Sequence, residues 1–419
     1  FFDMIDMIDK IDRIWRASVP TSRLPLCGRL VSGFIAATVM AAITVCAAES
    51  GAPTGIPDVL KTAAGEPVTT VEMWERVRRP EVLELFKTHV FGRNAVERPS
   101  TLRFEPIEPD REMMEGKALR KRVNIRYSGP GGEGAIALTA FIPKAAQPVP
   151  AFVLICNRSS AKHIDPDRLT KNPFFPAEEL VARGYAALAF HNGDVDPDVH
   201  DGFTNGVHAV FQPDPSVRKP DAWGTIAAWA WGASRVMDWI ETQPAIDRTR
   251  VGVVGHSRGG KTALWCGATD TRFALTISNN SGCGGAKFNR MALPKSESIA
   301  RINKSFPHWF CTNYKQYGDN EAALPVDQHM LVALIAPRLA YVASATLDDW
   351  AGQPGEFHSC LLASPVWRLY GQQGLVGETF PAPDTPLHQG RVGYHLRTGK
   401  HDLTLYDWQR FMDFADKHK

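Results

Sequence analysis

Apolar residues along this chain form short continuous runs that alternate with longer amphipathic stretches. Short runs of this kind are typical of strands buried on both faces of a parallel sheet. We expect such strands at 151–156, 186–190, 251–254, 275–278, 339–343 and 393–396. Helical periodicity separates them, most clearly at 178–183, 223–243 and 407–414. Strands that alternate with helices predict an α/β fold with a mostly parallel sheet.

The region before the first buried run has a different pattern. Helical periodicity covers 71–79 and 80–90, and strand-like segments follow at 102–104, 120–127 and 135–141. The last two segments are joined by Gly129-Pro130-Gly131-Gly132, which predicts a hairpin.

Two long segments, about 191–222 and 284–330, lack clear periodicity and are rich in Asn, Gly, Pro and aromatic residues. We interpret them as insertions that rim a functional site, because such loops carry function in this class of fold. The pattern as a whole predicts a three-layer αβα sandwich.

The junction after the run 251–254 carries the clearest chemical signal. It reads Gly255-His256-Ser257-Arg258-Gly259 and leads into a helix-like stretch, 260–268. Strand, G-x-S-x-G and helix in this order form the nucleophile elbow of an α/β-hydrolase. The glycines leave room for a tight turn that presents the Ser257 hydroxyl, and the next backbone N–H can face a developing oxyanion.

Composition adds limits rather than a function. Of 419 residues, 44% are hydrophobic and 22% charged, and the formal net charge is +2. These values are ordinary for a globular protein and do not favour nucleic acid or an anionic membrane as a partner. The sequence contains neither H-E-x-x-H nor a C-x-x-C cluster, so we expect no metal or other cofactor.

The first residues resemble an export signal. Arg23 and Arg29 precede the uncharged segment 30–48, which ends in Cys46-Ala47-Ala48. We therefore expect a signal peptide within 1–48, cleaved after Ala48, and a single catalytic domain over 49–419. The alternative is a membrane anchor, and residues 1–15 fit neither segment. Export predicts a secreted or periplasmic protein.

Five cysteines follow residue 48, and an odd number leaves at least one free thiol. Cys156 and Cys266 fall in a predicted strand and a predicted helix, where buried thiols are common. An oxidising compartment permits one disulfide among Cys283, Cys311 and Cys360, although the sequence does not give the pairing.

A serine nucleophile needs a base and an acid, which follow it along the chain in α/β-hydrolases. His401 lies between the last predicted strand and the terminal helix, as the base should. The acid is expected after the strand 339–343, where Asp348 and Asp349 both qualify by position.

Several motifs resemble those of the glucuronoyl esterases of carbohydrate esterase family 15, in their bacterial form. They are Gly-His-Ser-Arg-Gly-Gly-Lys at 255–261, Ser-Asn-Asn-Ser-Gly-Cys-Gly-Gly at 278–285, Phe-Pro-His-Trp-Phe at 306–310, Asp348-x-Trp350 with Gly-Glu-Phe at 355–357, and Gly-Lys-His-Asp at 399–402. The resemblance covers most of 55–419. It implies an α/β-hydrolase without a cofactor that cleaves esters between 4-O-methylglucuronic acid of xylan and lignin alcohols.

The resemblance also implies residue roles. Ser257 matches the nucleophile and His401 the base, while Arg258 matches an arginine that stabilises the oxyanion. Lys261 and Glu297 are similar to groups that bind sugar hydroxyls, and Trp350 to a tryptophan that packs on the glucuronoyl ring. Lys261 lies four residues after Ser257, which puts both on one helix face.

One position departs from the family. Many members carry the acid as a glutamate where this chain has Asn280, and an amide cannot carry the charge that stabilises an imidazolium. Asp348 matches an aspartate that some bacterial members have, so we assign it as the acid and keep Asp349 as the alternative. A second oxyanion donor is expected from the N–H of Asn157 or Arg158.

Two other functions stay open. The chain could be a carbohydrate esterase for acetyl or feruloyl groups, or an inactive hydrolase fold that binds glucuronoxylan, which Asn280 would favour. We expect glucuronoxylan or a lignin–carbohydrate ester as partner, no nucleic acid, no membrane after signal removal, and a monomer.

Overall fold

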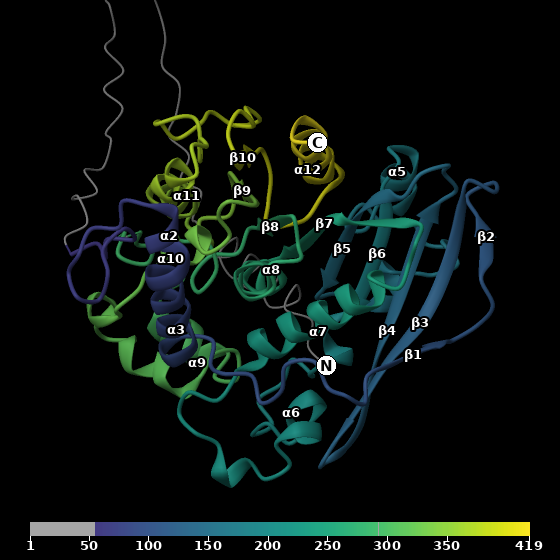
Figure 1. Cartoon of the computed structure of the whole chain (residues 1–419), viewed down its shortest axis with the longest axis horizontal. Helices are drawn as coiled ribbons and strands as arrows, with labels where there is room; N and C mark the ends of the chain where they lie inside the picture. Colours follow the sequence, from purple (N-terminus) through teal and green to yellow (C-terminus); the bar gives the residue numbers. More distant parts are fainter. Residues whose placement is uncertain (1–54, 292) are drawn as a thin grey trace, which may run out of the picture. The chain divides into compact units, whose positions relative to one another are not determined.

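The computed structural model describes residues 55–291 and 293–419. The expected signal peptide, residues 1–48, lies outside the described residues. Ten strands of the described residues pair into one sheet in the order β1-β3-β4-β6-β5-β7-β8-β9-β10, with β2 on β3 (Figure 1). The strands are β1 Arg103–Pro106, β2 Arg111–Met113, β3 Ala118–Gly129, β4 Gly132–Pro143, β5 Val149–Cys156, β6 Ala186–His191, β7 Ile246–His256, β8 Leu275–Asn279, β9 Leu339–Ala345 and β10 Val392–Arg397.

The sheet is antiparallel at one end and parallel over the rest. β1 to β4 form the antiparallel end, and the pairing of Gly129 with Gly132 closes the predicted β3–β4 hairpin. β4 also pairs antiparallel with β6, and from β6 to β10 every neighbouring pair is parallel. The prediction of a mostly parallel sheet preceded by a hairpin is therefore confirmed.

Helices cover both faces of the sheet. Side chains alternate along β5, so that Val153 and Ile155 join the core cluster with α7 and α8, whereas Phe152 and Leu154 join the cluster with α5 and α12. Figure 1 shows these two pairs of helices on opposite sides of the strands. The helices are α2 Val71–Met73, α3 Arg79–His89, α4 Ser160–His163, α5 Ala177–Ala182, α6 Gly206–Phe211, α7 Thr225–Ile240, α8 Arg258–Thr269, α9 Ile299–Ser305, α10 Gln328–Ala333, α11 Gln353–Leu369 and α12 Leu405–Lys417.

The N-terminal helical region is one continuous helix with a wider turn inside it. α2 runs into a π-helical turn, Trp74–Arg78, and then into α3. The Thr70 side chain caps its start by accepting a hydrogen bond from Met73 N at 3.2 Å. Fully buried Trp74 lies in the wide turn, and the next turns pack Val82 and Phe86 into the main core.

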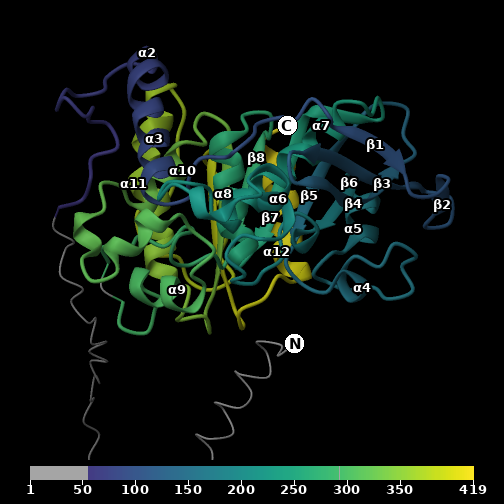
Figure 2. The same cartoon turned by 90° about the horizontal axis from the view of Figure 1, so that it is seen from below.

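The two predicted insertions consist of short helical pieces and loops. The first contains α6 and the 3₁₀ turns Asn192–Asp194 and Pro215–Val217, and the second contains α9, the 3₁₀ turns Thr312–Tyr317 and Glu321–Ala323, and the start of α10. In Figure 2, as in Figure 1, α9 and α10 lie with α3 and α11 at the β10 end of the sheet. Short pieces of this length leave little periodicity to detect in a sequence.

All five cysteines of the described region are buried free thiols. The sequence allows one disulfide among Cys283, Cys311 and Cys360, and this expectation is wrong. Burial raises the pKa of the Cys311 thiol to about 11 and that of Cys283 to about 12, which keeps both thiols protonated and unreactive. These cysteines act as small hydrophobic side chains in the packed interior.

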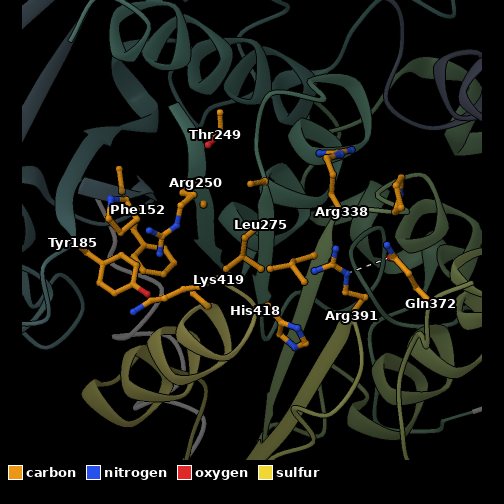
Figure 3. Close-up of a pocket in the computed structure, with 17 residues that line it drawn as sticks. Phe152, Tyr185, Thr249, Arg250, Leu275, Arg338, Gln372, Arg391, His418 and Lys419 are labelled. Atoms are coloured by element: carbon orange, nitrogen blue, oxygen red, sulfur yellow. Dashed lines mark hydrogen bonds between the residues drawn. The ribbon is translucent and has the colours of Figure 1, made fainter. Parts of the chain in front are cut away.

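A cavity of about 320 Å³ lies at the amino ends of the parallel strands (Figure 3). Phe152, Arg250, Leu275 and Leu339, from the starts or amino-terminal halves of β5, β7, β8 and β9, line it. The predicted nucleophile follows the carboxyl end of β7, so this cavity is on the opposite edge of the sheet.

In the described part of the chain, no helix is long and apolar enough to cross a membrane.

A fully buried carboxyl group ties the carboxyl edge of the sheet together. Glu356, in the first turn of α11, accepts hydrogen bonds from the backbone N–H groups of Ser281 and Gly282 at 2.8 and 2.9 Å and from Ser344 Oγ at 2.6 Å. Burial raises the pKa of Glu356 to about 7, and the charge of Asp348 acts in the same direction, against these hydrogen bonds.

We predict that this carboxyl group makes stability depend on pH. Folded Glu356 keeps its proton up to about pH 7, whereas the unfolded chain releases it near the ordinary value of 4.5. The free energy of unfolding should therefore fall as the pH rises from about 4.5 to about 7. Urea unfolding at pH 5 and pH 7.5 measures this fall, and Glu356→Gln should make it smaller. An unchanged pH dependence in the variant would contradict the prediction.

The elbow glycine gives a second prediction. A Cβ on Gly255 would lie 1.9 Å from the carbonyl oxygen of Gly259, which is far inside van der Waals contact. Gly255→Ala should lower the free energy of unfolding by about 2 kcal/mol or more, since backbone must move to accept it. Gly318→Ala, where the nearest atom would be 3.2 Å away, is the matched control. Equal stability of the two variants would reject the argument.

Candidate active site

Ser257 occupies a strained turn between β7 and α8. Its φ of 56° and ψ of −122° are conformations that L-residues rarely adopt. The Ser257 N–H donates to Asn279 O of β8 at 2.9 Å, and its carbonyl accepts from Gly260 and Lys261 of α8. These bonds hold the turn to its neighbours on both sides. Ser257 is half-buried at the carboxyl edge of the sheet.

His401 reaches this edge from the loop between β10 and α12. Its ring centre lies 4.5 Å from that of His256, the residue before Ser257. His256 Nδ1 donates to Asn279 Oδ1 at 2.6 Å, and burial, with the nearby His401, lowers the pKa of His256 well below its ordinary value. A neutral, fixed His256 ring therefore supports the His401 ring.

The loop that carries His401 is fixed by its own contacts. Arg397 Nη2 donates to the carbonyls of Lys400 and Asp402, both at 2.7 Å. Arg158 Nη2 pairs with the Asp402 carboxylate at 2.8 Å. The imidazole is thus held in place before any ligand arrives, which is what a general base requires.

Asp348 is the carboxylate that contacts His401. His401 Nδ1 donates to Asp348 Oδ2 at 2.6 Å, and Asn280 Nδ2 donates to the same oxygen at 2.8 Å. Burial raises the pKa of Asp348, but these two donors and the charge of His401 outweigh it and lower the pKa below its ordinary value. Asp349 points elsewhere: its side chain is 57% exposed and pairs with Lys295.

Arg258 is the first residue of α8, as the sequence indicates. Its guanidinium Nη1 contacts the Asp198 carboxylate, and its Cζ lies 5.7 Å from the ring centre of Trp309. The Nε–H of Arg258 is buried, and no described residue accepts a hydrogen bond from it. A buried donor without an acceptor is costly, so this group is suited to receive an acceptor from a ligand.

Lys261 and Glu297 lie close together, and both side chains are deeply buried. Lys261 Nζ donates to the carbonyls of Ser281 and Cys283 at 2.5 and 2.6 Å, and it lies 3.5 Å from Glu297 Oε2. The two side chains are each only 4% exposed. The 3.5 Å contact is long for a hydrogen bond, so the bonds to the two carbonyls fix Lys261 more firmly than Glu297 does.

Trp350 lies next to Glu297 and is far more exposed than Glu297 and Lys261. It is 36% exposed, its carbonyl accepts from Glu297 N at 2.9 Å, and the Arg301 guanidinium lies 3.9 Å from its ring centre. Among the predicted site residues the structure joins Asp348 to His401, places the His401 ring against His256 next to Ser257, and joins Glu297 to both Lys261 and Trp350. In the described region, no group of three or more His, Cys, Asp or Glu side chains is arranged to hold a metal ion.

Sequence reasoning missed the partners of these residues. Asp198, His308 and Trp309 meet around Arg258, although His308 and Trp309 are within a motif of the family resemblance and Asp198 is not. The only signal for Asp198 is a run of four aspartates at 194, 196, 198 and 201. The second oxyanion donor, the N–H of Asn157 or Arg158, stays a prediction; the Asn157 side chain has a buried Oδ1 without a hydrogen-bond donor among the described residues.

Comparison with known proteins agrees with this geometry. The family described as "Glucuronyl esterase, fungi" matches residues 178–371. A promiscuous CE15 esterase from a marine bacterial metagenome is 39% identical, with a TM-score of 0.78, over 89% of this chain and 98% of that one. The glucuronoyl esterase of Solibacter usitatus is 36% identical, with a TM-score of 0.81, over 88% and 99%.

A curated relative extends the comparison to fungi. The 4-O-methyl-glucuronoyl methylesterase of Thermothelomyces thermophilus is 29% identical over 336 residues, which are 77% of this chain and 74% of that protein. The expected α/β-hydrolase fold is confirmed by the sheet order and by these structural neighbours. Because the bacterial structures are aligned over nearly their full lengths at well above 30% identity, the chain belongs to carbohydrate esterase family 15, the glucuronoyl esterases.

Proposed function

We propose that this protein is a serine esterase that hydrolyses esters of 4-O-methylglucuronic acid or glucuronic acid, as in the lignin–carbohydrate linkages of glucuronoxylan. The observation that carries the proposal is the hydrogen-bonded pair of Asp348 and His401 beside the strained Ser257. The 4-O-methyl-glucuronoyl methylesterase activity named for the Thermothelomyces relative supports the substrate class.

Each step of acyl transfer has a residue for it. His401 takes the proton of Ser257 Oγ, and the oxygen attacks the uronoyl carbonyl carbon. The carbonyl oxygen becomes an oxyanion that accepts from the backbone N–H and the unpartnered Nε–H of Arg258. The imidazolium returns its proton to the leaving alcohol, and water then cleaves the acyl-enzyme by the same route to release the uronic acid.

Asp348 holds His401 in the tautomer that this reaction needs. Nδ1 carries the proton toward the carboxylate, which leaves Nε2 free to act as base. The negative charge of Asp348, maintained by its lowered pKa, stabilises the imidazolium. Asn280 carries no negative charge, but its amide donates a hydrogen bond to the Asp348 carboxylate, which does.

Sugar recognition falls to the residues around Trp350. We propose that its exposed ring packs on the uronoyl ring, and that Lys261 and Glu297 bind hydroxyls of the sugar. The buried position of these two charges keeps them fixed and makes a hydroxyl that bridges both groups a specific requirement.

The domain and location follow as further proposals. We propose one catalytic domain over 49–419, preceded by a signal peptide within 1–48, and a protein that acts as a secreted or periplasmic monomer. The export proposal depends on the segment 30–48 alone.

A second activity is favoured by one comparison. The marine bacterial neighbour is described as promiscuous, which supports ester hydrolysis beyond uronates. An acetyl or feruloyl esterase would not need the charged pair of Lys261 and Glu297. The inactive binding protein is disfavoured, because the Asp348–His401 pair supplies the acid that Asn280 cannot.

Substrate preference separates these functions. The kcat/KM for the benzyl ester of glucuronic acid should exceed that for benzyl acetate, which has the same leaving group, by at least about 10-fold, because only the uronate offers hydroxyls to the charged pair. Ser257→Ala should lower both rates by several orders of magnitude. Preference for the acetate would reject the uronate specificity, and turnover that survives Ser257→Ala would reject the nucleophile.

The acid can be tested by two neighbouring aspartates. Asp348→Asn should lower kcat by up to about 10⁴-fold, since the amide stabilises the wrong imidazole tautomer. Asp349→Asn is the matched control, because that carboxylate is exposed and contacts Lys295 rather than His401. Near-normal turnover of Asp348→Asn, or a larger loss in Asp349→Asn, would contradict the assignment.

A further inference from the structure

The guanidinium of Arg258 is fixed by a group that the mechanism does not use. Nη1 contacts Asp198 Oδ2, whereas Nε has no acceptor among the described residues. An arginine side chain at the start of a helix has several accessible rotamers. The contact with Asp198 therefore selects the one in which Nε stays free.

Asp198 is itself fully engaged. Its other oxygen, Oδ1, accepts from His308 Nε2 at 2.9 Å and from Trp309 Nε1 at 2.7 Å. Its side chain is only 21% exposed. Although burial raises the pKa of Asp198, the hydrogen bond from His308 and the charge of Arg258 lower it to about 2, so the carboxylate is ionised throughout the range in which an esterase works.

The donors to Asp198 are attached to the rigid core. The carbonyls of His308 and Trp309 accept from the N–H groups of Thr225 and Ile226, in the first turn of α7, at 2.9 and 3.1 Å. The Trp309 ring also stacks on Phe306 with centroids 3.7 Å apart. Asp198 comes from the first insertion and His308 and Trp309 from the second, so both insertions meet at this one carboxylate.

We propose that Asp198 is a positioning residue for the esterase reaction. It holds Nη1 so that the Nε–H and the backbone N–H of Arg258 converge on the carbonyl oxygen of the substrate. The inference rests on the proposed role of Arg258 at the oxyanion. The support for it is the contact itself: the carboxylate that holds the guanidinium of the residue after Ser257 is in turn fixed by His308 and Trp309.

A double-mutant cycle on the full chain tests this role, with a methyl ester of glucuronic acid as substrate. Arg258→Ala should lower kcat by about 100-fold or more, as expected for loss of an oxyanion donor. Asp198→Ala should lower kcat by about 10-fold or more with KM changed by less than about threefold, since the oxyanion forms only in the transition state. In the Arg258→Ala background, Asp198→Ala should cause no further loss.

Controls separate positioning from folding. Asp214→Asn, an exposed aspartate of the same insertion that bonds only to Ser216, should leave kcat unchanged. Asp198→Glu keeps the charge and should recover kcat relative to Asp198→Ala. Melting temperatures show whether each variant folds, and if Asp198→Ala does not fold, the same-shaped Asp198→Asn takes its place in the cycle.

The outcomes distinguish the two proposals. Losses that multiply in the double variant, or full kcat in Asp198→Ala while Arg258→Ala is impaired, would overturn the positioning role and leave the proposed function intact. Full kcat in Arg258→Ala would reject the oxyanion role itself and the inference that rests on it.

Discussion

The site depends on one constraint, the positive φ of a serine between β7 and α8. A residue at φ 56° and ψ −122° costs on the order of 1–3 kcal/mol, and it persists only where its surroundings determine it. Here the Ser257 N–H is bound to β8 and its carbonyl to α8, and the crowding at Gly255 excludes any side chain below the turn. The strained backbone places the Ser257 hydroxyl beyond the carboxyl edge of the sheet, where the loops that carry Asp348 and His401 also begin.

Around that hydroxyl, three buried carboxyl groups differ in charge because they differ in partners. Asp348 has His401 and Asn280 as donors, and Asp407 has His395, Arg397 and Asn279, and both have lowered pKa values. Glu356 has no cationic partner and a raised pKa. The two aspartates therefore favour the ionised form because their partners donate hydrogen bonds or carry positive charge, whereas Glu356 joins three elements as a neutral acid below about pH 7.

Much of the fold could be predicted because it follows local patterns. Continuous apolar runs mark β5, β6 and β9, and Gly184 ends α5 with a φ of 81° where a helix stop is expected. α11 could not be predicted, because Pro354, Gly355 and Pro365 interrupt its pattern while tertiary packing against α10 stabilises it. The thiols were misjudged because pairing depends on geometry that spacing does not contain.

The same distinction applies to the site. Ser257 and His401 could be chosen as candidates from a short motif and chain order, and the choice of Asp348 required a resemblance as well. The burial of Lys261 and the contact of Asp198 with Arg258 could not be found, since each depends on segments 20 or more residues apart that lack periodicity. A residue such as Asp198, which contacts a distant part of the chain, leaves no local sequence pattern, even though its partner Arg258 is part of a motif.

The position of Asp198 suggests how one fold can carry different ester specificities. Ser257, Asp348 and His401 follow the carboxyl ends of the core strands β7, β9 and β10. Arg258, which we propose for the oxyanion, is different, because its guanidinium contacts both insertions through Asp198, His308 and Trp309. On the proposed role of Arg258, changes in the insertions alter how strongly a given carbonyl is stabilised, so loops tune turnover as well as binding.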